Sequence, residues 1–276
     1  MVYKKYSGAG NTFLMVKNLD DTIKNHKDIV LELISKKGNE KFDGVIFLKS
    51  SDIADFHMNY FNKDGTGNAL CGNGLRCTAR YIEDNKLFSG KIITLEAVSK
   101  IYKCEILSNG QISVAFPPPN LIKLNFTLKI NFYEWWQQLR VHFVDIGSPH
   151  IVIFIKDIKN PIVNNLFEVN INDWGRNIRM HKELMPEGAN VNFVELKSYE
   201  RSELEIRSYE RGVEGETLAC GTGAISTAIV SYSVYDIVPP IKILTKSGEY
   251  LTVDFQVEDG KIRNLSLAGN ANEIYE

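Results

Sequence analysis

Two cysteines stand at the start of closely similar glycine-rich loops. Residues 71–74 read Cys-Gly-Asn-Gly, and 149 residues later residues 220–223 read Cys-Gly-Thr-Gly. Each loop follows a strand-like segment and precedes an apolar segment with helical spacing, so each cysteine is expected at the N-terminus of a helix. The positive end of the helix dipole there favours the thiolate over the thiol. Similarity at one large spacing also indicates a duplicated domain.

Two such loops could hold one amino acid. The backbone N–H groups in the first turn of a helix lack partners and form a seat for a carboxylate, and glycines allow a ligand to approach closely. A carboxylate held there places its α-carbon beside the sulfur. If both loops faced one α-carbon, one thiolate could remove the α-proton and the other thiol could return a proton from the opposite face. The outcome is inversion of configuration without a cofactor.

The bulk composition narrows the class of protein. A chain of 276 residues can form one large or two small domains. The formal net charge is −2, and the basic residues are scattered, which argues against nucleic acid or an acidic membrane surface as the main partner. No apolar run reaches membrane-spanning length, and the N-terminal segment lacks the apolar core of a signal peptide. We therefore expect a cytoplasmic location.

The remaining cysteines and the alternative uses of the loops can be weighed in the same way. Cys77 and Cys104 are expected to be small buried hydrophobes, and free thiols are favoured over disulfides. No metal site is predicted, because the ligand spacing of a zinc site is missing. Phosphate binding by the loops is disfavoured because the Walker and Gly-x-Gly-x-x-Gly patterns are absent. A dithiol redox pair is disfavoured because no Cys-x-x-Cys occurs.

The elements that must position the loops follow from periodicity. Apolar spacing predicts helices at residues 26–37, about 74–85, 172–179 and about 223–235. The first of them would bury one face formed by Ile29, Val30, Leu33 and Ile34. Alternation and turn residues predict strands at 2–7, 12–17, 45–48, 55–61, 91–98, 101–107, 111–116, 139–146, 151–155, 191–196, 203–209, 241–245, 250–256 and 261–267. Three prolines at 117–119 mark a domain boundary. The helix at 223–235, rich in small residues, is expected to be buried. The pattern indicates a largely antiparallel α+β protein.

At the loop residues and several further motifs, the chain resembles the diaminopimelate epimerase family. The motifs are Gly-Ala-Gly-Asn-Thr-Phe at 8–13, Phe-Asn-Lys-Asp-Gly at 61–65, the first loop through Cys77, Pro-His at 149–150, Gly-Ala-Asn-Val-Asn-Phe at 188–193, Tyr-Glu-Arg-Gly at 209–212 and the second loop within 216–224. They span nearly the whole chain. The resemblance implies a cofactor-independent isomerase that interconverts LL- and meso-diaminopimelate, in lysine and peptidoglycan precursor biosynthesis, and that forms a homodimer.

The resemblance also implies a fold and a set of site residues. The fold would be two pseudo-symmetric α/β domains, residues 1–117 and 118–267, each a curved, mostly antiparallel sheet around a central helix, with the active site in the cleft between them and residues from about 268 to 276 returning to the first domain. The acid/base residues would be Cys71 and Cys220. The α-carboxylate would bind the backbone N–H groups of Gly72, Asn73, Gly221 and Thr222. The distal end of the substrate would contact Asn11, Asn62, Asn190 and Arg211. Polar neighbours of the reacting centre would be His150 and Glu210, the latter also counted among the substrate contacts.

Three positions depart from the family pattern, and each bears on selectivity for the distal group. Ser148 stands where asparagine is frequent, Glu214 adds one residue between Arg211 and the second loop, and Gly44 lacks the amide side chain of some members. Two alternatives stay open. One is another amino-acid racemase of this fold, although Asn73 differs from the Cys-Gly-His-Gly of proline racemase-like enzymes. The other is a non-catalytic amino-acid-binding protein.

Individual residues also have purely structural interpretations. Asn11 could be a turn residue, about as often as a ligand contact. A lone histidine such as His150 is more often structural. Glu210 and Arg211 taken alone would be a solvated pair that contributes little to stability.

Overall fold

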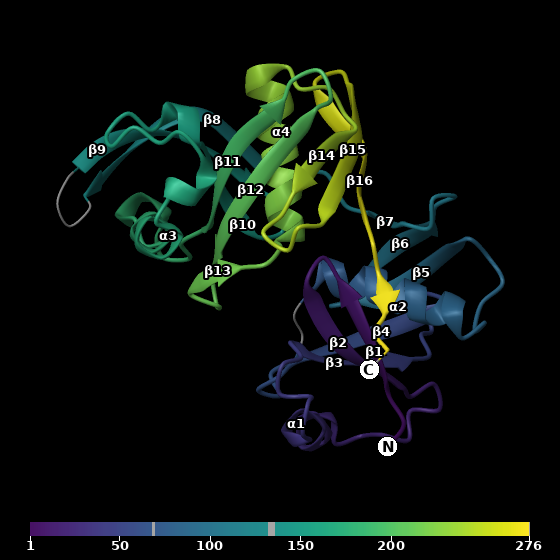
Figure 1. Cartoon of the computed structure of the whole chain (residues 1–276). Helices are drawn as coiled ribbons and strands as arrows, with labels where there is room; N and C mark the ends of the chain where they lie inside the picture. Colours follow the sequence, from purple (N-terminus) through teal and green to yellow (C-terminus); the bar gives the residue numbers. More distant parts are fainter. Residues whose placement is uncertain (68–69, 132–135, 276) are drawn as a thin grey trace. The chain divides into compact units, whose positions relative to one another are not determined.

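A computed structural model describes residues 1–67, 70–131 and 136–275 of the chain (Figure 1). The chain divides into two compact units. Unit 1 comprises Met1–Phe116 and Ala268–Glu276, and unit 2 comprises Pro117–Leu267. Within the described ranges, no helix has the length and apolar character needed to cross a bilayer.

Unit 1 is a curved sheet that carries two helices. Its elements are β1 (Lys4–Gly8), β2 (Asn11–Lys17), α1 (His26–Ser35), β3 (Gly44–Lys49), β4 (Phe56–Asn62), α2 (Gly72–Asp84), β5 (Ile92–Ala97), β6 (Lys100–Ile106), β7 (Ile112–Ala115) and β17 (Asn272–Glu273). Hydrogen bonds place the strands in the order β17, β1, β2, β3, β4, β5, β6, β7. The pairs β2–β3 and β4–β5 are parallel, and the others are antiparallel.

Helix α2 lies at the centre of unit 1, in contact with strands at both ends of the sheet order. Its apolar side chains Leu75, Ala79 and Ile82 are all fully buried, as the predicted spacing requires. Helix α1 instead covers the outer face, where Val30 and Leu33 are buried in a separate apolar cluster against β2 and β3. The helix predicted at 26–37 is therefore confirmed in place and in the face that it buries.

Unit 2 is also a sheet around a central helix, but its described residues contain more strands and helices than those of unit 1. Its elements are β8 (Leu121–Asn131), β9 (Trp136–Asp145), β10 (Pro149–Phe154), η1 (Ile155–Asp157), η2 (Leu166–Glu168), α3 (Ile171–Arg179), η3 (Lys182–Leu184), β11 (Asn190–Ser198), β12 (Glu203–Glu210), β13 (Gly215–Thr217), α4 (Gly221–Tyr235), β14 (Ile241–Leu244), β15 (Tyr250–Glu258) and β16 (Lys261–Gly269), whose last two residues belong to unit 1. Hydrogen bonds give the order β8, β9, β10, β11, β12, β14, β15, with β13 paired to the end of β12.

Helix α4 is the buried centre of unit 2. Every residue from Gly223 to Ser231 is buried, and the helix contacts β9, β10, β11, β14 and β15. Small side chains such as Ala224 and Ala228 allow strands to pack closely around it. The prediction of a buried, small-residue helix at this position is confirmed.

The two units share a connectivity that explains the duplicated loops. In unit 1 the chain passes from β4 through α2 to the parallel neighbour β5, and in unit 2 it passes from β12 through α4 to the parallel neighbour β14. Parallel neighbours need a crossover connection, which the helix supplies. The prediction of mostly antiparallel sheets is right for most pairs, but the strands on either side of each central helix are parallel.

Some elements differ from the sequence prediction. Strand β8, which follows shortly after the proline run, was not predicted, although its apolar residues alternate with exposed polar residues such as Lys123 and Asn125. The short strand β13 was also not predicted. Strand β9 begins at Trp136 rather than at Leu139. Helices α2 and α4 each begin two residues earlier than predicted, at Gly72 and Gly221.

Candidate active site

Cys71 and Cys220 occupy the same structural position in the two units. Each is the N-cap residue of the buried central helix, with φ −127° and ψ 107° for Cys71 and φ −116° and ψ 108° for Cys220. Each sulfur accepts a hydrogen bond from the backbone N–H three residues on, at 3.3 Å from Gly74 and 3.4 Å from Gly223. The predicted placement of both cysteines at helix N-termini is therefore confirmed.

The first turn of each helix leaves donors for an anion. In unit 1 the Cys71 carbonyl accepts from Leu75 and the sulfur accepts from Gly74, so the N–H groups of Gly72 and Asn73 have no acceptor within the helix. A side chain at Gly72 would meet only the ring edge of Phe116, at 3.5 Å, within 4 Å. The backbone at this point is therefore accessible to a small carboxylate.

The second glycine of each loop has a different role from the one expected. An added Cβ at Gly223 would overlap the Asn192 side-chain oxygen and lie 3.2 Å from the Cys220 sulfur. At Gly74 it would lie 3.2 Å from Ile46 Cδ1. These two glycines are required by close packing inside the protein, whereas the sequence suggested that they make room for a ligand.

In unit 1 the predicted residues Asn11 and Asn73 are joined to one another. Asn73 is only 4 % exposed, and its Nδ2 donates to Asn11 Oδ1 at 2.5 Å. The side-chain Oδ1 of Asn73 accepts from the fully buried Arg76 guanidinium at 2.6 Å, and Asn11 Nδ2 in turn donates to Asp43 Oδ2 at 3.2 Å. Asp43 and Arg76 were not predicted as site residues, and their contacts fix the orientation of both amides.

Asn62 lies at the end of β4 in a separate set of contacts. Its Oδ1 accepts from the Tyr60 hydroxyl at 2.8 Å, and its Nδ2 donates to Thr66 Oγ1 at 3.0 Å. Burial, and after it the neighbouring Cys71, raise the pKa of Tyr60, so its phenol stays protonated. Tyr60 thus lies near Cys71 and holds the Asn62 amide.

In unit 2, Asn190 and Arg211 are joined through the backbone. Asn190 Oδ1 accepts from the Arg211 N–H at 2.8 Å, and its Nδ2 donates to the Pro149 carbonyl at 3.2 Å. The guanidinium of Arg211 donates to the Glu187 carbonyl at 3.3 Å, with its side chain 35 % exposed. An arginine fork that is partly exposed and only weakly held can turn toward a ligand carboxylate.

Glu210 and Cys220 are electrostatically coupled. The Thr217 hydroxyl donates to Glu210 Oε1, and burial raises the pKa of the Glu210 carboxyl. Burial, followed by the charge of Glu210, also raises the pKa of Cys220 well above its usual value. Hydrogen bonds from Thr222 and Gly223 oppose this rise but are outweighed. Burial and the charge of Glu210 therefore oppose the stabilisation of a Cys220 thiolate that the helix N-terminus provides.

His150 lies on β10, and its side chain is buried beside the first turn of α4. Burial, and after it the charge of Arg211, lower the pKa of His150 to about 3, so the imidazole is neutral. Its Nε2 lies 2.9 Å from Thr222 Oγ1 and 3.0 Å from Ser148 Oγ. Ser148 also donates to Thr222 Oγ1, at 3.4 Å. Ser148, which departs from the family pattern, thus forms hydrogen bonds with His150 and Thr222 of unit 2.

Two residues of this network were not predicted. Asn192 and Ser208 are 0 % and 3 % exposed, and Asn192 Nδ2 lies 3.1 Å from His150 Nδ1. Both belong to strands that the sequence predicted, at residues 191–196 and 203–209. A polar residue at an inward position of such a strand was the available signal.

Other features of the described residues lie apart from this chemistry. Cys77 and Cys104 are fully buried as predicted, and burial raises the pKa of Cys104 to about 12. No group of three or more His, Cys, Asp or Glu in the described part of the chain is arranged to hold a metal ion.

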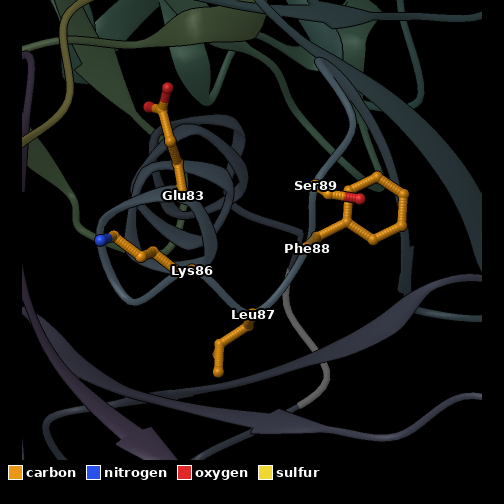
Figure 2. Close-up of a pocket in the computed structure, with 5 residues that line it drawn as sticks. All are labelled: Glu83, Lys86, Leu87, Phe88 and Ser89. Carbon is orange, nitrogen blue, oxygen red and sulfur yellow. The ribbon is translucent and has the colours of Figure 1, made fainter.

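A cavity of about 550 Å³ is lined by Glu83, Lys86, Leu87, Phe88 and Ser89 (Figure 2). It lies at the C-terminal end of α2, roughly 18 Å along the helix from its cysteine, and contains no predicted site residue.

Comparison with known proteins gives a consistent result. The family model described as diaminopimelate epimerase matches residues 3–122 and 142–272. The chain is 34 % identical to a diaminopimelate epimerase of Aquifex aeolicus, with 100 % of this chain and 96 % of the relative covered. It is also 34 % identical to one of Chlorobaculum tepidum, with 98 % and 97 % covered.

Solved structures with lower sequence identity share the fold. A PhzF-family phenazine biosynthesis protein of Bacillus anthracis superposes with a TM-score of 0.73 at 17 % identity, covering 99 % of this chain and 96 % of that one. A probable proline racemase of Agrobacterium radiobacter superposes with a TM-score of 0.65 at 14 % identity, with 99 % and 90 % covered. The predicted fold class, two α/β domains that each hold a mostly antiparallel sheet around a central helix, is confirmed, and the sheets also contain parallel pairs.

Proposed function

Because the chain belongs to the diaminopimelate epimerase family, we propose that it is an isomerase that interconverts LL- and meso-diaminopimelate, with Cys71 and Cys220 as its acid/base residues. One observation carries the assignment of the cysteines. Both sulfurs are N-caps of the buried central helices of two units with the same connectivity, and the first-turn N–H groups beside each sulfur lack acceptors within the helix.

The chemistry follows from the protonation of the two sulfurs. In one direction Cys71, as thiolate, takes the α-proton and becomes a thiol. Cys220, whose raised pKa favours the thiol, delivers its proton to the opposite face of the α-carbon and becomes a thiolate. The reverse direction exchanges these roles. Atoms and charge balance without a redox step, and the reaction requires both sulfurs to reach the same α-carbon.

The remaining residues are assigned to substrate binding. We assign the α-carboxylate to the N–H groups of Gly72, Asn73, Gly221 and Thr222. The distal amino-acid group is assigned to Asn11, Asn62, Asn190 and Arg211, whose amides and guanidinium suit a zwitterion. Glu210 and His150 tune the second half-site, since both lie beside its cysteine loop. Membership of the family supports four further parts of the proposal. Units 1 and 2 are the two domains, the protein forms a homodimer, it is located in the cytoplasm, and it acts in lysine biosynthesis.

Isotope exchange tests the assignment. The protein, incubated with LL-diaminopimelate in deuterated water, should yield meso product carrying deuterium at the inverted carbon. Cys71→Ser and Cys220→Ser should each abolish product, because serine keeps the N-cap but is far too weak an acid to exchange protons with an α-carbon. Cys104→Ala, at a buried cysteine of β6 that belongs to neither loop, should retain activity. If the parent forms no labelled product yet binds diaminopimelate in calorimetry, it is a binding protein and the epimerase assignment is wrong.

A further inference from the structure

The polar network of unit 2 has a direction that its donors and acceptors determine. It begins at Asn192, in the middle of the buried strand β11. Asn192 Nδ2 donates to the Ile151 carbonyl at 3.0 Å, and its Oδ1 accepts from the Ser208 hydroxyl at 2.8 Å. A backbone carbonyl can only accept, so the amide cannot be turned over without losing this bond. The NH₂ group of Asn192 is therefore the one that faces His150.

This orientation determines the tautomer of His150. The imidazole is neutral, because burial lowers the pKa of His150 to about 3. The Asn192 NH₂ group lies 3.1 Å from His150 Nδ1, so Nδ1 must accept. In a neutral imidazole the other nitrogen then carries the hydrogen. His150 consequently donates from Nε2, toward the hydroxyl oxygens of Thr222 at 2.9 Å and Ser148 at 3.0 Å.

The direction of the Thr222 hydroxyl follows. Its oxygen accepts from His150 Nε2 and, at 3.4 Å, from the Ser148 hydroxyl. Two donors on one oxygen leave its own hydrogen to point elsewhere. The Cys220 sulfur lies 3.6 Å away, within reach of a hydrogen bond to sulfur. The Asn190 NH₂ group directs one hydrogen to the Pro149 carbonyl at 3.2 Å and lies 3.4 Å from His150 Nε2, farther than Asn192 Nδ2 lies from Nδ1.

We propose that Asn192 is a positioning residue for the reaction: it sets the tautomer of His150 and thereby aims the Thr222 hydroxyl hydrogen at the Cys220 sulfur. The inference rests on the proposed function in so far as Cys220 exchanges protons with the substrate. A hydroxyl directed at the sulfur stabilises it most when the sulfur is a thiolate, because hydrogen bonds to a charged acceptor are the stronger ones. The burial that disfavours the Cys220 thiolate is thereby partly offset.

Nitrogen NMR of the histidine-labelled protein tests the first step without any turnover. Wild-type His150 should show an unprotonated Nδ1 and a protonated Nε2. Asn192→Asp replaces the donor with an acceptor, so the hydrogen should move to Nδ1. Asn39→Asp provides the matched control, since Asn39 is a buried asparagine in unit 1 whose NH₂ group also donates to a backbone carbonyl. It should leave the His150 signals unchanged. A wild-type His150 protonated at Nδ1 would overturn the proposal even if Asn192→Asp failed to fold.

Kinetics and alkylation test the second step. Thr222→Val should lower kcat by roughly tenfold to a hundredfold, the loss expected for one hydrogen bond to a charged group. KM should change little, because the backbone N–H of residue 222 remains, and Thr222→Ser should restore kcat. Asn192→Asp should lower kcat by a similar factor, but should add little in the Thr222→Val background, since both act through the same hydroxyl.

The rate of Cys220 alkylation by iodoacetamide separates the inference from the proposed function, because it requires no turnover. Its pH profile should shift to higher pH in both Thr222→Val and Asn192→Asp. If the parent alkylates in this way but does not epimerise, the proposed function fails and the hydrogen-bond relay stands. If both variants keep the parent's alkylation profile, or if their effects on kcat multiply fully, the relay is wrong whatever the parent catalyses.

Discussion

Asn73 and Asn11, 62 residues apart, share a hydrogen bond of 2.5 Å between Asn73 Nδ2 and Asn11 Oδ1. The contact holds a residue of the first cysteine loop against the turn between β1 and β2. It also continues to Arg76 on one side and to Asp43 on the other. Two residues that the sequence suggested as separate ligand contacts are therefore joined by a hydrogen bond.

This pairing predicts non-additive effects. Asn73→Ala should cost more than Asn11→Ala, because it also removes an acceptor from the buried Arg76 guanidinium, and loss of such a bond costs about 1–3 kcal/mol. The double variant should be little worse than Asn73→Ala alone in both kcat/KM and the free energy of unfolding. Asn177→Ala, an exposed asparagine on α3, serves as the control. Fully additive losses would show that the two amides act independently.

Glu210 is predicted to restrain the reactivity of Cys220. After burial, the carboxylate of Glu210 is the next largest cause of the raised pKa of Cys220. Glu210→Gln removes this charge, so the pKa of Cys220 should fall and its alkylation by iodoacetamide at pH 7 should become severalfold faster. Epimerisation should slow, because a thiol that has lost its proton cannot act as the acid. Peptide mass spectrometry would follow alkylation of Cys220. Unchanged alkylation would show that the carboxylate does not influence the sulfur.

Acid should destabilise unit 2 through two buried histidines. Burial lowers the pKa of His150 to about 3 and that of His142 to about 4, from 6.5. Because both pKa values are depressed in the folded state, the stability that each contributes is complete above pH 6.5 and is lost as the pH falls toward the folded value. Each should cost roughly 2 kcal/mol at pH 5.

Urea unfolding followed by tryptophan fluorescence measures this loss, since all three tryptophans lie within residues 117–267. His150→Gln and His142→Gln should each flatten the decline in unfolding free energy between pH 7.5 and pH 5. His181→Gln, at a more exposed position, should not. An equally steep decline in all three variants would assign the acid sensitivity to other groups.

Gly44 is predicted to be intolerant of any side chain. It pairs with Asn62 across β3 and β4, and an added Cβ would overlap the Phe61 carbonyl oxygen and lie 2.7 Å from the Tyr60 ring. Gly44→Asn should therefore destabilise unit 1 by roughly 1–3 kcal/mol, measured by thermal melting with circular dichroism. The matched control is Gly110→Asn, at an open turn with φ +82° that asparagine tolerates. A Gly44→Asn protein as stable as the control would contradict the packing argument.

The sequence predicted best what local chemistry determines. Both central helices, the face that α1 buries and the capping positions of Cys71 and Cys220 were identified, because glycine turns and apolar spacing are local signals. Strand β8 was not predicted, although residues 122–131 alternate between apolar and polar side chains and therefore carried the period-2 signal of a strand. The resemblance predicted Asn11, Asn190 and His150 as site residues, but it did not predict the residues whose hydrogen bonds orient them.

What could not be predicted depends on contacts between distant strands. Asn192 is an ordinary polar residue in the sequence, and only the packing of β10 against β11 places it beside His150. The causes that raise the pKa of Cys220 could not be predicted for the same reason. A helix N-terminus is visible in the sequence, whereas the burial of the sulfur and the nearness of Glu210 are properties of the folded chain.

Each of the two sulfurs also accepts a hydrogen bond at the start of its own helix, from the Gly74 or Gly223 amide. A group attached to the sulfur by an alkylating agent or an oxidant would disturb this hydrogen bond as well as block the sulfur. Chemical damage at either cysteine should therefore be visible as fraying of the first helical turn, with faster amide hydrogen exchange there than in the undamaged protein.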